Sequence, residues 1–180
     1  MLDLRGRVNQ LPHNYTCPQA VRTKLPEEYY STSYIANQAS NWIANRKNNK
    51  KPFFLMVSFP DPHHPFTPPG KYWDMYKPEE MPIPIAYEVN DWDPPEYIKI
   101  AERERSLDKT LGERAGYSVA VSKQESLEAR ALTCGMISMI DDAVGQIRQA
   151  VGDANVGQNT VQIYTSDHGD HLGDHRLLFK

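Results

Sequence analysis

The segment Thr160–Lys180 limits what this chain can fold into more than any other, because it changes abruptly from strand-forming residues to a dense polar cluster. β-Branched and aromatic side chains dominate up to Thr165 and stop at polar Ser166, which predicts a β-strand that ends at Ser166. The next nine positions contain three aspartates, three histidines and two glycines: Asp167, His168, Gly169, Asp170, His171, Gly173, Asp174 and His175. Such a density is hard to explain by solubility alone.

This polar cluster has the chemistry of a metal-binding loop. Carboxylate oxygen and imidazole nitrogen are both good ligands for a divalent cation, and glycine lets the backbone turn so that neighbouring side chains converge. In open α/β sheets, ligands collect at the carboxyl ends of the strands, which is where Asp167 and His168 fall. The alternative is a solvated polar loop whose histidines are incidental.

A second apolar run followed by a polar loop occurs earlier in the chain. Residues 52–59 read Pro-Phe-Phe-Leu-Met-Val-Ser-Phe, which is typical of a buried parallel strand covered by helices on both faces. Residues 60–69 contain five prolines in ten positions, and because proline fixes φ and removes a backbone donor, we expect a stiff loop. Taken alone, the pair His63–His64 in this loop is compatible with packed or exposed loop residues.

Helical periodicity accompanies both predicted strands. Apolar residues recur at helical spacing over residues 31–46, where residues 31–33 offer caps, and again over residues 123–151. The order helix, strand, excursion, helix, strand is a crossover pattern, which predicts an α/β fold. The remaining segments are expected to be irregular: 1–26, a solvated turn at 45–51, and an excursion over about 70–121.

Two charged stretches are assigned to helix surfaces. Residues 102–105, Glu-Arg-Glu-Arg, are expected to form a solvated helix face within the excursion. Asp141 and Asp142 lie inside the second predicted helix, so we interpret them as surface residues or as supports of the ligands, not as ligands themselves.

Charge and composition narrow the classes of partner. Twenty Lys and Arg against twenty-three Asp and Glu leave a net charge of -3 without a basic stripe, so nucleic acid is not expected as a partner. Apolar residues make up 39% of the chain, and no apolar run approaches the roughly 20 residues of a membrane span. Residues 1–7 lack a hydrophobic stretch of signal-peptide type, and Cys17 and Cys134 fit no metal or disulfide pattern, so localisation stays open.

Three stretches resemble the sulfatase family of the alkaline-phosphatase-like superfamily. They are Ser-Asp-His-Gly at 166–169 with Leu-Gly-Asp-His at 172–175 and Lys180, the run 52–69, and Met136–Gly145. The resemblance implies a partial alkaline-phosphatase-like α/β sandwich with a mostly parallel sheet flanked by helices. We expect residues 1–180 to form a single, incomplete sulfatase catalytic domain, an internal fragment of the enzyme.

The resemblance also assigns roles to four residues. Asp167 and His168 are expected to ligate a divalent metal, with Ca²⁺ as the first choice and Mg²⁺ or Mn²⁺ as alternatives. Lys180, thirteen positions after Asp167, is expected to contact the sulfate ester, although a lysine there would otherwise be interpreted as a solvated charge. His63 matches the catalytic histidine of a His-x-Pro sequence, with His64 as the intervening residue.

One element of the sulfatase pattern is not found. Sulfatases oxidise the cysteine of a Cys-x-Pro-x-Arg motif to formylglycine, the nucleophile, whereas Gln19 and Val21 stand at the proline and arginine positions after Cys17. Cys17 is therefore interpreted as an ordinary loop or core thiol. The formylglycine is expected in a missing N-terminal segment, and the isolated chain is expected to be inactive.

The resulting functional hypothesis is metal-dependent hydrolysis of a sulfate ester by the full-length enzyme, with the sulfate ester as the partner and the oligomeric state open. One alternative is a phosphonate monoester or phosphodiester hydrolase of the same superfamily. The other is a non-catalytic metal-binding remnant.

Overall fold

A computed structural model of the chain describes residues 10–46, 51–88, 92–107 and 118–180. The N-terminal residues 1–7, in which no signal peptide was predicted, lie outside these ranges, as do parts of the predicted turn at 45–51 and of the excursion at 70–121. Residues 10–26 contain no helix, in agreement with the predicted irregular segment. No helix in the described residues is long and apolar enough to cross a membrane.

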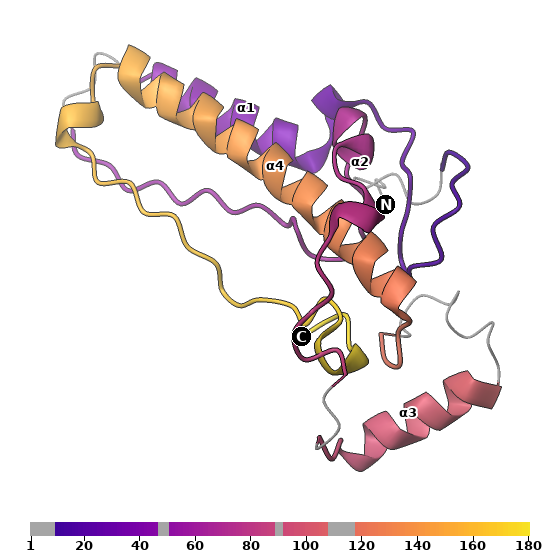
Figure 1. Ribbon diagram of the computed structural model, residues 1–180. Helices are drawn as coiled ribbons and strands as arrows, with labels where there is room; N and C mark the ends of the chain where they lie inside the picture. The colour runs from indigo at the N-terminus through magenta and orange to yellow at the C-terminus, as the bar shows by residue number, and fades with distance from the viewer. Residues whose placement is uncertain (1–9, 47–50, 89–91, 108–117) are drawn as a thin grey trace.

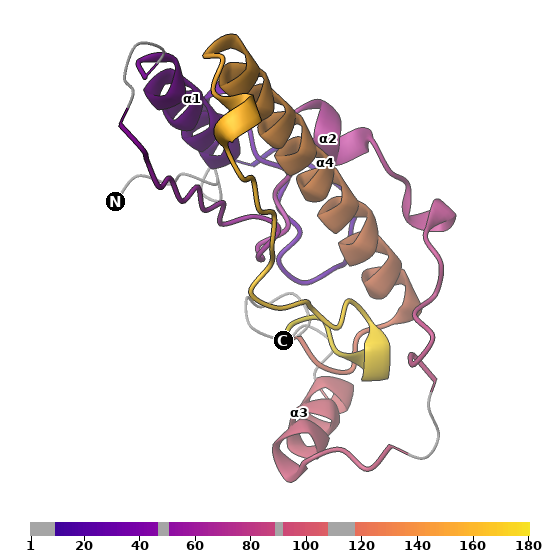
Figure 2. The ribbon, with the colours of Figure 1, turned by 90° about the vertical axis from the view of Figure 1, so that its left-hand side faces the viewer.

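Two helices form the packed layer of the molecule. Helix α1 spans Ser31–Ala44 and helix α4 spans Lys123–Asp153, and they lie side by side in both ribbon views (Figures 1 and 2). Both predicted helices are thereby confirmed, with ends that differ by about two residues. The buried apolar residues of α4 follow the predicted stripe: Ala131, Leu132, Met136, Met139, Ile140 and Val151.

The two helices begin in different ways. Helix α4 starts with a capping box, in which Ser122 Oγ accepts from Glu125 N at 3.2 Å while Glu125 Oε2 accepts from Ser122 N at 2.6 Å. For α1, the prediction of caps from residues 31–33 is wrong, because the N-cap is Tyr30 and no side-chain cap hydrogen bond is formed. The buried Asp61 carboxylate lies against the first turn of α1 instead, bonded to Thr32 Oγ1 at 2.7 Å.

The region after the proline-rich loop contains more helix than expected. Helix α2 spans Lys71–Asp74 and packs closely on α4, where a Cβ added at Gly135 would lie 2.2 Å from the Tyr72 carbonyl oxygen. Helix α3 spans Glu96–Leu107 and lies apart from the α1–α4 pair (Figures 1 and 2). Short 3₁₀ turns occupy Glu27–Tyr29, Pro78–Glu80, Gly157–Asn159 and Asp174–Arg176.

The solvated helix face expected at residues 102–105 is present in α3 at Arg103 and Glu104, which are exposed, but not at Arg105. Arg105 donates to the carbonyl oxygen of Val119 at 2.7 Å and forms an ion pair with Glu125, and both of these charged side chains are largely buried. A guanidinium can satisfy several acceptors at once, which allows it to anchor α3 to the start of α4.

The segment at residues 52–59 is extended and shows the alternation of a strand. Its odd-numbered residues are half-buried; Phe53 meets Trp42 of α1 edge to face at 5.4 Å, and Leu55 packs against the cluster formed by Ile43, Val151 and Ala154. Its even-numbered residues face outward. The predicted helix cover is therefore present on one face only.

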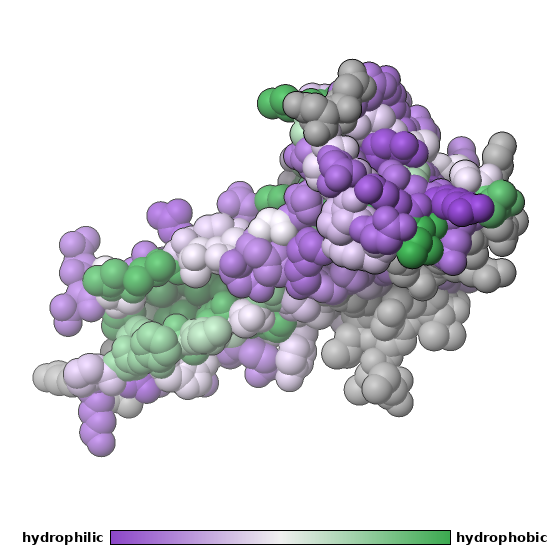
Figure 3. Space-filling view, turned by 90° about the horizontal axis from the view of Figure 1, so that it is seen from below, coloured by the Kyte–Doolittle hydropathy of each residue, from purple (hydrophilic) through white to green (hydrophobic). Residues whose placement is uncertain are grey.

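The segment at residues 160–166 is also extended, and it runs beneath the helix pair in the same general direction as residues 52–59 (Figure 1). On the outward faces of the two segments, large apolar side chains are strongly exposed: Phe54 at 90%, Met56 at 77%, Val161 at 87%, Ile163 at 84% and Tyr164 at 74%. Figure 3 shows hydrophobic side chains gathered on the face seen from below.

A hydrogen-bonded sheet is not formed among the described residues. Their only β-pairings are the isolated bridges Gln10–Thr23, antiparallel, and Ala20–Phe66, parallel. The strand pattern at 52–59 and 160–166 thus produces extended backbone, but a ladder needs a neighbouring strand that donates and accepts in turn. The α/β class agrees with this arrangement, while the mostly parallel sheet stays a prediction.

Candidate active site

The proline-rich loop at residues 60–69 is held at both ends. Asp61 is buried near its start, and Phe66 and Thr67 are fully buried near its end. Phe66 also exchanges backbone hydrogen bonds with the segment before α1, since its N–H donates to the Gln19 carbonyl at 2.9 Å and its carbonyl accepts from Val21 N at 3.0 Å. The stiffness predicted from the prolines is thus reinforced by buried contacts.

The two histidines of this loop form a stack that reaches the C-terminal segment. His63 is exposed, and its ring stacks on the ring of His64 with 4.0 Å between centroids. The other face of the His64 ring system lies against Phe179 at 3.7 Å with an angle of 13° between planes. Nδ1 of His63 lies 2.6 Å from the His64 carbonyl oxygen and donates to it, because a carbonyl can only accept. The sequence predicted His63 but gave His64 and Phe179 no role.

The other three predicted site residues, Asp167, His168 and Lys180, contact one another, and Lys180 directly follows Phe179 in the chain. The ammonium of Lys180 donates to Nε2 of His168 at 2.9 Å, and the same Nε2 lies 3.4 Å from Oδ2 of Asp167. The four predicted site residues thus fall in two groups: Asp167, His168 and Lys180 contact one another, and His63 belongs to a ring stack that ends at Phe179, the residue before Lys180.

The contacts of His168 define its tautomer. Its Nδ1 lies 2.9 Å from the Gly169 carbonyl oxygen and must donate to it, while Nε2 accepts from the Lys180 ammonium, which has no acceptor. With its hydrogen on Nδ1, His168 would present a lone pair on Nε2, the form in which imidazole binds metals. The backbone N–H of His168, which donates to Asp167 Oδ1 at 3.0 Å, holds the pKa of the Asp167 carboxyl below its usual value.

The predicted polar cluster divides into two halves. Asp174 accepts from Ala86 N at 3.0 Å, the His175 N–H donates to the Ala86 carbonyl at 2.8 Å, and the His175 ring contacts Trp92 at 4.5 Å. This second half therefore packs on the region between α2 and α3. Gly173 lies between the two halves with φ of 112°, and the chain can pass there only because glycine has no Cβ, which would lie 1.9 Å from Ser126 Oγ.

A complete metal centre is not assembled among the described residues, which contain no group of three or more His, Cys, Asp or Glu side chains able to hold an ion. Asp167 and His168 nevertheless fit a metal as two of its ligands. A carboxylate oxygen with a lowered pKa lies beside an imidazole lone pair, and the Asp167 side chain is 85% exposed and so accessible to an ion.

Cys17 has the environment of a core residue, which confirms the interpretation as an ordinary thiol. It is 5% exposed and packs in one cluster with Phe66 and Leu178. Burial, assisted by the nearby Glu128 carboxylate, raises the pKa of the Cys17 thiol well above its usual value. Burial also raises the pKa of Cys134. Neither thiol is activated as a nucleophile.

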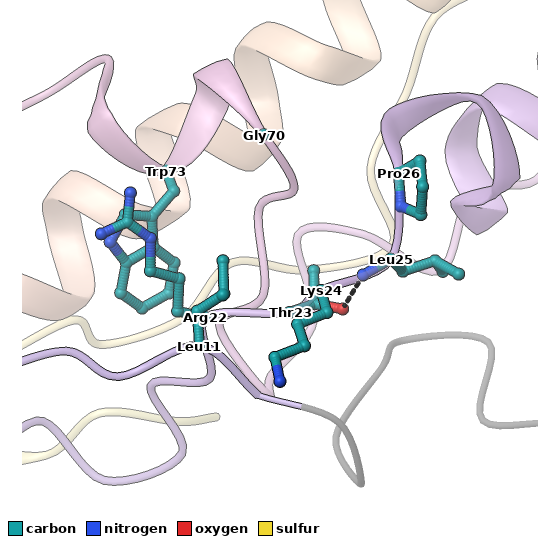
Figure 4. Close-up of a pocket in the computed structure, with 8 residues that line it drawn as sticks. All are labelled: Leu11, Arg22, Thr23, Lys24, Leu25, Pro26, Gly70 and Trp73. Carbon is teal, nitrogen blue, oxygen red and sulfur yellow. Dashed lines mark hydrogen bonds between the residues drawn. The ribbon is translucent and has the colours of Figure 1, made fainter.

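A separate pocket lies beside α2 (Figure 4). It encloses about 190 Å³, less than the several hundred Å³ of typical ligand pockets. Arg22 at its wall is already paired with Asp74, and Thr23 Oγ1 accepts from Leu25 N at 3.0 Å. None of the four predicted site residues lines this pocket.

The arrangement of helices and extended segments is shared with a known class of hydrolase. Over 99% of this chain and 34% of the other, it superimposes on a phosphonate monoester hydrolase from Agrobacterium radiobacter with a TM-score of 0.71 and 24% sequence identity. At that identity the match establishes the fold.

The family follows from the sequence. The sulfatase family profile matches residues 6–180, and the chain belongs to this family. It is 32% identical over 88% of its length to the "multifunctional alkaline phosphatase superfamily protein PehA" of Trinickia caryophylli, and 33% identical over 86% to an arylsulfatase of Clostridium perfringens. It covers 31% and 29% of these two proteins, so it spans about a third of the length of the curated relatives it matches.

Proposed function

We propose that this chain belongs to an enzyme that hydrolyses a sulfate ester, and that residues 1–180 belong to a single catalytic domain of it. The family supports the reaction class. The observation that carries the proposal is that the ring stack of His63, His64 and Phe179 ends one residue before Lys180, whose ammonium contacts His168 beside Asp167. A histidine, a lysine and a carboxylate brought together at the ends of two extended segments suit an anionic ester.

Asp167 and His168 are the residues that would hold a divalent metal ion, through the exposed carboxylate and the Nε2 lone pair. When bound, such an ion supplies positive charge that polarises oxygens of the ester. The Nε2 that would hold the ion is also the atom that the Lys180 ammonium contacts, so with an ion in place the ammonium would be available to another acceptor. We propose that this acceptor is a sulfuryl oxygen.

His63 is proposed to transfer a proton at the ester oxygen. Its ring is exposed, stacked on His64, and oriented by the hydrogen bond from Nδ1 to the His64 carbonyl. Imidazole is the side chain best suited to proton transfer near neutral pH. The nucleophile is not expected to be Cys17 or Cys134, because both thiols are held in the protonated form.

The test is an assay of the full-length protein on 4-nitrophenyl sulfate, before and after removal of bound metal by a chelator. We expect turnover that disappears with the metal and returns when Ca²⁺, Mg²⁺ or Mn²⁺ is added. A folded protein that binds metal but turns over no sulfate ester contradicts the proposal.

Phosphonate monoester or phosphodiester hydrolysis is a second candidate, favoured by the shared fold with the phosphonate monoester hydrolase. Parallel assays on phenyl phosphonate and sulfate monoesters separate the two, since the better substrate has the higher kcat/KM. A non-catalytic metal-binding remnant predicts metal content without turnover of either ester.

A further inference from the structure

The loop that carries His63 is fixed by a buried carboxylate. Asp61 is 6% exposed, and its two oxygens accept hydrogen bonds from the Tyr30 hydroxyl at 3.3 Å and from Thr32 Oγ1 at 2.7 Å. Both donor residues are fully buried. Buried hydrogen bonds to a charged group are stronger than those between neutral groups, so this contact sets the position of the backbone two residues before His63.

The same buried group also holds the other end of the loop. The Tyr30 hydroxyl lies 2.7 Å from Thr67 Oγ1, so Asp61 and Thr67 meet at one phenol. Between them, the His63 N–H donates to the Pro60 carbonyl at 3.2 Å and closes a turn. His63 is thus carried on a loop whose two ends are joined through a single buried network.

Charge favours Asp61 at this position. Helix α1 has no acidic residue in its first turn and no side-chain cap, although the N-terminus of a helix carries partial positive charge. The carboxylate reaches this turn through Thr32, the second residue of α1. An amide in its place would keep one acceptor oxygen but would replace the other, which now accepts from a hydroxyl, with a donor NH₂ group.

We propose that Asp61 is a positioning residue for His63: its buried carboxylate, bonded to Tyr30 and Thr32, holds the histidine in the orientation needed at the ester. This inference rests on the proposed function. Misplacement of a reacting group by about 1 Å can lower a rate by about 10²-fold. Asp61 therefore acts on the reaction only through the geometry of the loop.

The test compares Asp61→Asn with Glu128→Gln in the full-length protein. Glu128 is a control of similar burial, because it is 2% exposed and accepts from the backbone N–H groups of Thr16 and Cys17, outside residues 60–69, and reaches that loop only through the packing of Cys17 on Phe66, at the end away from Asp61. Both variants are expected to lose thermal stability. Only Asp61→Asn is expected to lower kcat by about 10²-fold, with KM within about twofold and metal content unchanged.

A second readout does not depend on turnover. With ¹³C-labelled histidine, the NMR signal of the His63 ring, assigned with His63→Gln, is expected to shift or broaden in Asp61→Asn and to stay in place in Glu128→Gln. If Asp61→Asn fails to fold, Thr32→Val and Thr32→Ser replace it. Thr32→Val removes the donor to Asp61 and is expected to move the His63 signal, whereas Thr32→Ser keeps the hydroxyl and is expected to restore it.

The outcomes separate the two proposals. An unmoved His63 signal in Asp61→Asn or Thr32→Val overturns the positioning role, as does an equal effect of Glu128→Gln on that signal. If the wild-type protein turns over no sulfate ester, the proposed function has failed, and the His63 signal alone decides whether Asp61 orients the loop.

Discussion

The two loops that meet at the candidate active site are held in opposite ways. The loop at 60–69 carries His63 above buried anchors, with Phe66 and Thr67 at 0% exposure and Asp61 at 6%. The loop that follows residue 166 is exposed through Gly169, and it is held by short local contacts such as Ser166 Oγ to the His168 carbonyl at 2.7 Å. One loop is thus shaped by the core, and the other by its own polar groups.

Because of this difference, we expect substitutions under the first loop to lower stability and substitutions in the second loop to lower activity. A substitution under the first loop breaks buried hydrogen bonds and is expected to lower the free energy of unfolding. A substitution in the second loop removes an exposed group, which changes stability by about 0.5 kcal/mol at most, but it removes a group proposed to act on the metal or the ester. A bound ion would in turn stabilise the second loop by mass action.

The largest effect is expected at the exposed loop. Asp167→Ala and His168→Ala should each lose bound metal and lower kcat/KM by about 10³-fold or more, because they remove proposed ligands of the charge that polarises the ester. The melting temperature of the metal-free protein should not change. Metal analysis and kinetics on each variant check this, with Asp141→Ala, exposed on α4, as the control. Full metal occupancy in Asp167→Ala would refute the assignment of Asp167 as a ligand.

Lys180→Ala sharpens the comparison with an effect on kinetics alone. Lys180 is exposed and its hydrogen bond is to His168, so its loss should leave the melting temperature unchanged. A charge-assisted contact to a sulfuryl oxygen is worth a few kcal/mol, which predicts a fall in kcat/KM of about 10²-fold. Lys99→Ala, which breaks the exposed ion pair with Asp93, is the control and should have no kinetic effect. Wild-type kinetics in Lys180→Ala would contradict the proposed contact and would mean that Lys180 is a solvated surface charge.

How much the sequence predicts also differs between the loops. Periodicity located α1 and α4 because each buries one continuous stripe, whereas His63, Asp167, His168 and Lys180 were predicted from the resemblance to sulfatases and remain predictions. The sequence did not reveal that His64 and Phe179 stack on each other, since ring stacking between distant segments leaves no local pattern.

The anchoring role of Asp61 could not be predicted from the sequence for a related reason. An aspartate before a proline is typical of a turn, and its donors lie about thirty positions away, on Tyr30 and Thr32. The sequence offered one indirect indication. The first turn of α1 lacks an acidic residue, so a carboxylate from elsewhere in the chain is favoured there. Likewise, the strand pattern at 52–59 fixes the alternation of faces but not the neighbour that would complete a sheet.

A smaller effect, on stability alone, is expected beneath the first loop. Thr67→Val keeps the shape of the side chain but removes a hydrogen-bond partner of the buried Tyr30 hydroxyl. The free energy of unfolding should fall by about 1 kcal/mol, measured by urea denaturation. The same substitution at exposed Thr165, in the segment leading to the second loop, should have almost no effect. Equal losses in both variants would remove the distinction between the loops.

The smallest effect concerns Cys17, which packs with Phe66 under the first loop. Because burial raises the pKa of this thiol well above its usual value of 9.0, the folded protein holds it protonated. Its contribution to stability is therefore complete below pH 9.0 and declines as the pH rises further, since only the unfolded thiol then ionises.

At neutral pH, iodoacetamide should label half-buried Cys134 slowly and Cys17 more slowly still, and both should react fast in urea. Mass spectrometry of timed samples measures the two rates. Rapid labelling of native Cys17 would mean that the base of the proline-rich loop opens readily, and the two loops would then differ in composition but not in how firmly they are held.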